Sequence, residues 1–109
     1  MTRLDVIRMI GNMLTEIDVR VGSLMPGDPD LVRLQDLRRL LDSRQQILAR
    51  QAFDENTTQF QEAAKRLRAV NREVREELER LDDTVAVIGN VARFLDEVTG
   101  FMTSLQVFG

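Results

Sequence analysis

The architecture of this chain follows from residues 53–102, which read FDENTTQFQEAAKRLRAVNREVREELERLDDTVAVIGNVARFLDEVTGFM. An apolar residue recurs at every seventh position of this stretch. A seven-residue apolar repeat is typical of helices that bury a narrow, coiled-coil-like seam against other helices. The sequence therefore predicts an all-α protein. The repeat consists of Phe53, Phe60, Leu67, Val74, Leu81, Ile88, Leu95 and Met102.

Length and composition are typical of a small globular protein. The chain has 109 residues, of which 43% are hydrophobic and 30% are charged. This balance is that of folded domains and not of disordered segments. We therefore expect residues 1–109 to form a single helical domain. Because the chain has five Phe and neither Trp nor Tyr, its core is expected to be mainly aliphatic.

The first helix boundary lies at residues 21–29, which read VGSLMPGDP. The two glycines favour helix termination, and Asp28-Pro29 is typical of an N-cap followed by proline at the first helical position. Apolar residues on both sides of this segment step by three and four, as on one face of a helix. The sequence therefore predicts helices at about 3–23 and 29–52.

A second boundary is indicated by the polar run DENTT at residues 54–58. Thr58 and Gln61 have the spacing of a capping box, in which two side chains satisfy the first free backbone N–H groups of a helix. We therefore expect a third helix at about 57–81.

Two interpretations are compatible with the residues that follow. Asp82, Asp83 and Thr84 suit a helix N-terminus, yet the apolar repeat continues through them unchanged. The first interpretation adds a fourth helix at about 84–107 and predicts an antiparallel, up-and-down four-helix bundle. The alternative is one continuous C-terminal helix of about 50 residues and about 75 Å. Typical helix lengths favour the break.

The residue types that most often carry catalysis or bind metals are missing. The chain has no His and no Cys, which removes the commonest general base, the thiol nucleophile and the usual zinc ligand sets. No glycine-rich phosphate loop and no EF-hand spacing occurs either. We therefore expect that the protein is not an enzyme, with no catalytic residue, no cofactor, no metal site and no identified small-molecule substrate.

Acidic residues cluster within residues 73–83 and could supply oxygen ligands to a divalent cation. They also alternate with arginines at i,i+4 spacing, as in Arg72 with Glu76 and Arg75 with Glu79. Such pairs stabilise exposed helices modestly. A solvated helix face is therefore favoured over a cation site.

A basic stripe follows the third predicted helix at Lys65, Arg68, Arg72 and Arg75. It could meet nucleic acid or an acidic partner. Nucleic-acid binders usually have an excess of basic residues and aromatic side chains that stack on bases. Here the formal net charge is −3, and no aromatic residue accompanies the stripe. A solvated or salt-bridged face is favoured, and no nucleic-acid partner is expected.

Asn71 lies on the third predicted helix at a position that the apolar spacing directs toward the core. A buried Asn can fix register or oligomeric state at some cost in stability. It can equally lie at the edge of the seam, because the neighbouring Val70 is available for the core. These two interpretations are equally compatible with the sequence.

The segment after Thr84 is apolar over a much wider arc than the helix before it. At about 100° per residue, its apolar positions cover roughly 220° of the helical wheel. The first helix is also broad. Either these helices are the most buried of the bundle, or they expose a surface to a partner. The candidate partner or self-association surface consists of Met9, Met13, Val87, Val91, Phe94, Val98, Phe101, Leu105 and Phe108.

We therefore expect a non-catalytic protein–protein interaction module, which self-associates as a homo-oligomer or docks a partner protein through the apolar faces of its first and last helices. The alternative is a membrane-active, pore-former-like protein that hides its apolar terminal helices behind a charged hairpin. No signal peptide and no long apolar span is found, so a cytoplasmic location is expected, with leaderless export as the alternative. Every basic residue except Lys65 is Arg, which suggests a GC-rich bacterial genome.

Overall fold

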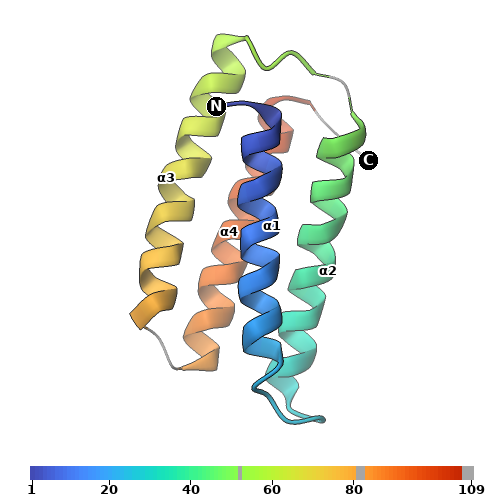
Figure 1. Cartoon of the computed structure of the whole chain (residues 1–109), viewed down its shortest axis with the longest axis vertical. Coiled ribbons are helices and arrows are strands. Elements are labelled where there is room, and N and C mark those ends of the chain that lie inside the picture. Colours follow the sequence, from blue (N-terminus) through green and yellow to red (C-terminus); the bar gives the residue numbers. More distant parts are fainter. Residues whose placement is uncertain (52, 81–82, 107–109) are drawn as a thin grey trace.

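The computed structural model describes residues 1–51, 53–80 and 83–106, and they form four α-helices (Figure 1). No strand occurs in these ranges. The predicted all-α bundle is therefore confirmed. The helices are α1 (Arg3–Val21), α2 (Pro29–Arg50), α3 (Thr58–Arg80) and α4 (Thr84–Ser104).

Side-chain oxygens at the predicted boundaries start three of the helices. Thr2 caps α1, Asp28 caps α2 ahead of Pro29, and Asp83 caps α4. Each accepts a hydrogen bond from a backbone N–H group that has no partner within the helix. The helix starts are thus determined by local chemistry that the sequence already contains.

The expected capping box of Thr58 and Gln61 is wrong by one residue. The hydroxyl oxygen of Thr57 accepts a hydrogen bond from the backbone N–H of Phe60 at 3.1 Å, so Thr57 caps α3. Gln61 instead donates its side-chain amide to the carbonyl oxygens of Met1 and Glu55. Thr57 and Thr58 are adjacent and both suit an N-cap, so the sequence alone does not show which of them caps the helix.

One expected helix end can be compared with the structure, and it differs by two residues. Helix α1 ends at Val21 and not at residue 23, because the backbone N–H of Gly22 closes the last turn on Asp18 and Arg20. The expected ends at residues 52, 81 and 107 lie outside the described residues.

The alternative of one continuous C-terminal helix is wrong. Helix α3 ends at Arg80, and α4 begins at Thr84 and packs back against α3. Arg93 of α4 forms an ion pair with Glu73 of α3. The N–H of Val85 donates to the Asp83 carboxylate at 3.0 Å, so the N-cap chemistry prevails over the unbroken apolar repeat.

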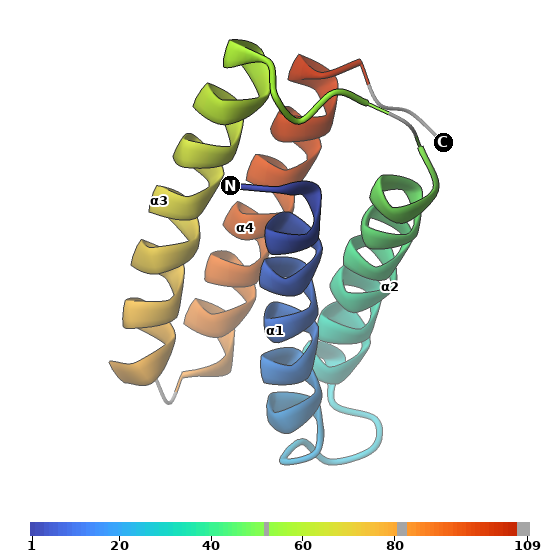
Figure 2. The same cartoon turned by 45° about the horizontal axis from the view of Figure 1, so that its top comes forward.

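The order of the helices around the bundle differs from a simple up-and-down bundle. Hairpins α1–α2 and α3–α4 are antiparallel, but the third close pair, α2 with α4, runs parallel (Figure 1). Arg44, late in α2, accordingly approaches Thr99, late in α4, at 3.5 Å. Helices α2 and α3 lie on opposite sides of α1 and α4 (Figure 2). The helices alternate in direction along the chain, as predicted, and α2 and α4 become neighbours because residues 53–57 lead the chain across the top of the bundle (Figure 1).

All four helices contribute to one hydrophobic core. The side chains of Phe60 and Phe94 are fully buried. The Phe60 ring stacks on Phe53, with centroids 5.6 Å apart, and meets the edge of Phe101 at 5.7 Å. No polar or charged residue of the described ranges is classed as buried. The core is apolar and contains an aromatic cluster at its upper end.

Candidate interaction surface

The candidate partner surface of the sequence analysis lies inside the folded chain. Helix α4 packs against both α2 and α3, so the candidate residues of α4 that the structure describes are covered by the chain itself. Val85, at the start of α4, is exposed. The most-buried-helix interpretation therefore describes the rest of α4. Met9, Met13, Val87, Val91, Phe94, Val98 and Phe101 are buried, Leu105 is half-buried, and Phe108 lies outside the described residues.

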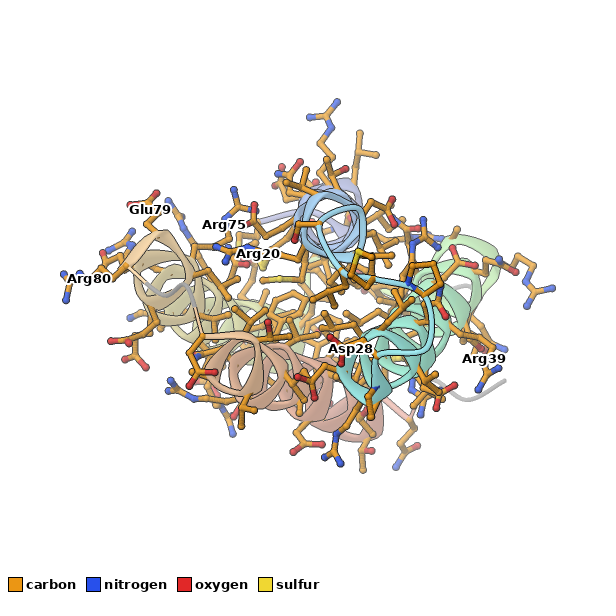
Figure 3. All side chains as sticks on the ribbon, turned by 90° about the horizontal axis from the view of Figure 1, so that it is seen from below. Arg20, Asp28, Arg39, Arg75, Glu79 and Arg80 are labelled. Carbon is orange, nitrogen blue, oxygen red and sulfur yellow. The ribbon has the colours of Figure 1, made fainter. Side chains whose placement is uncertain are left out.

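The side of the bundle between α1 and α3 is built differently from the other three. These two helices are not among the closely packed pairs, and long polar side chains span the space between them. Arg20 of α1 donates to the carbonyl oxygen of Leu78 at 2.6 Å, and Arg75 of α3 reaches the carbonyl oxygen of Asn12 at 3.4 Å. Figure 3 shows both arginines between the two helices.

A surface groove of about 380 Å³ runs along this side, and we call it the α1–α3 groove. The side-chain oxygen of Asn71 is buried there and has no hydrogen-bond partner among the described residues. Asn71 itself is half-buried. The edge-of-seam interpretation of this residue is therefore confirmed. The groove is lined by Met1 ahead of α1, by Asp5, Arg8, Met9 and Asn12 of α1, and by Arg68 and Asn71 of α3.

Arg68 of the basic stripe lines this groove, and Lys65 and Arg72 precede and follow it on α3. Lys65, Arg68 and Arg72 are exposed, and no carboxylate in the described ranges comes within 4.0 Å of any of them. The expected i,i+4 pair of Arg72 with Glu76 is not formed. Across the groove, Arg8 of α1 is exposed as well. The groove thus has basic residues on both walls in a chain whose net charge is −3.

The acidic lining residue, Asp5, is already engaged in the capping box of α1. Its carboxylate accepts a hydrogen bond from the Thr2 backbone at 2.8 Å, and its own N–H donates to the Thr2 hydroxyl oxygen at 3.2 Å. The hydrogen bond from the Thr2 backbone, together with the Thr2 side chain, lowers the pKa of Asp5 below its ordinary value. Asp5 therefore caps the N-terminus of α1, and attraction to Arg8 contributes to the same lowering of its pKa. Arg68 has no carboxylate of the described residues within 4.0 Å.

Sequence reasoning found the basic stripe but not the groove. Periodicity shows that Arg68 and Arg72 share one face of a helix. It does not show that Arg8 and Asn12 stand opposite them, because that depends on which helices become neighbours. An available signal was Arg68, the one member of the stripe with no carboxylate three or four residues away along the chain.

The remaining features of the described residues offer less chemistry. A second cavity of about 280 Å³ lies between α3 and α4, and Arg66, Asp96 and Glu97 line it with mixed charge. No three acidic side chains of the described ranges converge as metal ligands would, and Asp82 of the acidic cluster lies outside them. Within the same ranges, no helix combines the length and apolar character that a bilayer span requires.

Comparisons with protein-family models, with curated proteins and with solved structures found no match for this chain.

Proposed function

We propose that this chain is a non-catalytic helical module that binds a partner protein along the α1–α3 groove. One observation carries the proposal. The groove has a basic side chain on each wall, with no carboxylate of the described residues within 4.0 Å of either, and a buried Asn71 oxygen without a hydrogen-bond donor. The apolar candidate residues of α1 and α4 that the structure describes already belong to the core.

The chemistry of the groove suits a protein interface. Arg and Met are enriched at such interfaces relative to the rest of the surface, and both are found among the lining residues. A buried acceptor without a donor costs free energy in the isolated protein. A partner that supplies an N–H group at that point regains this free energy on binding, which favours association at this surface over others.

The proposal predicts position-specific cross-linking in the cells from which the protein comes. The photoreactive residue p-benzoylphenylalanine replaces Arg68 or Arg8 in the groove, and in a control chain it replaces Arg39. Arg39 is exposed on α2 and points away from the groove (Figure 3). Irradiation should attach one and the same protein at both groove positions and not at Arg39, as measured by mass spectrometry of the adducts.

The captured protein must then bind the purified chain directly. We expect Arg68→Ala to weaken that binding by about tenfold, the effect of losing a moderately important interface residue of about 1.4 kcal/mol. Arg39→Ala is expected to leave the affinity unchanged. Equal adducts at all three positions, or no protein adduct at the groove, would contradict the proposal.

A further inference from the structure

We propose that the α1–α3 groove recognises an acidic polypeptide segment, whose carboxylates pair with Lys65, Arg68 and Arg72 of α3 and with Arg8 of α1. This inference rests on the proposed function, because it names the chemistry of the partner at the same groove. It is carried by charge complementarity, the orphaned acceptor of Asn71 and the dimensions of the groove.

The charges of the groove are available to an outside ligand. Arg75 already donates to the carbonyl oxygen of Asn12, and Asp5 is held by the α1 capping box. In the described ranges, no carboxylate lies within 4.0 Å of Arg68 or Arg72. A guanidinium fork binds a carboxylate with two parallel hydrogen bonds, which makes Arg well suited to an acidic partner.

The spacing of these residues fits a segment of polypeptide. Lys65 and Arg72 are seven residues apart on one helix, which corresponds to about 10 Å along its axis. Acidic residues placed i,i+3 and then i,i+4 on a partner helix span the same seven residues. The groove follows α1 from Asp5 to Asn12, also about 10 Å of helix. About two turns of an acidic helix therefore match the basic positions along its length.

Asn71 favours a polypeptide over a simple anion. Its buried side-chain oxygen needs a hydrogen-bond donor. A carboxylate or phosphate alone is an acceptor and leaves that oxygen unpaired. A polypeptide segment supplies donors through its backbone and side-chain N–H groups together with its carboxylates.

Nucleic acid fits the same positive charge less well. Proteins that bind single strands combine basic grooves with exposed aromatic rings on which bases stack. Here Phe60, Phe94 and Phe101 are buried, and the Phe53 ring is half-buried against Phe60. The observations therefore favour an acidic polypeptide segment.

Fluorescence anisotropy with defined probes tests the inference on the full chain. The first probe is a labelled glutamate-rich helical peptide of about 16 residues, roughly 24 Å long. The second carries glutamine at every glutamate position, and the third is a single-stranded RNA of similar net charge. We expect the glutamate peptide to bind at least about tenfold more tightly than the other two probes, with an affinity that falls as salt is added.

Two double variants with the same change in charge locate the binding. Arg68→Glu with Arg72→Glu should weaken binding of the glutamate peptide by at least about tenfold, because attraction becomes repulsion at two contacts. Arg33→Glu with Arg50→Glu alters two exposed arginines of α2, across the bundle from α3, and should change the affinity by less than about twofold. Circular dichroism checks that both variants stay helical, and Arg68→Gln with Arg72→Gln replaces the first pair if it unfolds.

Four results would overturn the inference. The two double variants could lose affinity for the glutamate peptide equally, or the chain could bind the glutamate and glutamine peptides equally. The chain could also fail to bind the glutamate peptide, or bind the RNA more tightly than that peptide. Each is distinguishable from failure of the proposed function. If Arg68 and Arg8 still cross-link one protein, the groove is an interface whose partner is not acidic. If they capture none, the proposed function fails whatever the peptide does.

Discussion

At the scale of single residues, Asn71 combines a cost to folding stability with a proposed role in binding. Its side-chain oxygen is buried without a hydrogen-bond partner among the described residues. An unpaired buried acceptor lowers the stability of the fold, since water would otherwise bond to it. A partner that donates a hydrogen bond to this oxygen would remove that cost, and for this reason we include Asn71 in the proposed binding site.

Replacing Asn71 with leucine should therefore stabilise the isolated protein. Loss of the unpaired oxygen, with the better helix propensity of leucine, should raise the free energy of unfolding by about 1 kcal/mol. Urea denaturation followed by circular dichroism measures this change. Asn12→Leu is the control for propensity and added apolar surface, because Asn12 is an exposed helical residue of the same groove. A destabilised Asn71→Leu protein would show that this oxygen is satisfied in solution.

At the scale of elements, short polar segments decide where the helices begin. Asp83 illustrates this, because the apolar repeat runs across the junction and by itself favours one long helix. The Asp83 carboxylate accepts from the backbone N–H of Val85 at 3.0 Å and thereby starts α4. Helix α4 can then fold back on α3 and bury two seams at once, which gains more apolar burial than a straight extension.

The cap of α4 can be tested by Asp83→Ala. The change removes the side-chain acceptor at the N-cap and should lower the free energy of unfolding by about 1 kcal/mol. Asp96→Ala serves as the matched control, because Asp96 is an exposed residue inside the same helix. Chemical denaturation of the two variants provides the comparison. Equal stabilities would mean that the α3–α4 junction does not depend on this cap.

At the scale of the whole molecule, the wide apolar arc of α4 is explained by its neighbours. The helix packs against α2 on one side and α3 on the other, and its eight buried residues belong to the common core. A partner surface and an interior helix have the same apolar signature in the sequence. In the folded chain, burial in the interior accounts for that signature, and the proposed partner site lies on the polar α1–α3 side.

Phe94→Ala distinguishes these two roles of α4. Phe94 is fully buried, so the variant should lose about 3–5 kcal/mol of folding free energy through lost apolar burial and the cavity that remains. Val85→Ala, at a residue of α4 that is 65% exposed, should change stability by about 0.5 kcal/mol or less. Thermal and urea unfolding measure both values. If the Phe94→Ala protein kept its stability but bound itself or a partner protein more weakly, the result would support the apolar interface predicted from the sequence.

The agreement between sequence and structure is best where the interactions are local. The Asp28 side chain caps α2, and the ring of Pro29 fixes its φ angle at a value that suits a helix. Both effects act within a few residues and mark the start of α2. The choice between Thr57 and Thr58 failed because both hydroxyls can reach the same backbone groups. The basic stripe was recognised because residues three and four apart always share a helix face.

The sequence by itself determined an all-α protein, the helix boundaries near residues 21–29 and 54–58, and the absence of His and Cys. These properties depend on residue type and on spacing along the chain, which folding does not change. Only the tertiary structure decided that residues 58–104 form two helices, that α2 lies beside α4, and that Arg8 faces Arg68 across a groove. The physical reason is that apolar faces attract without direction, so periodicity defines which faces are buried but not which helices meet.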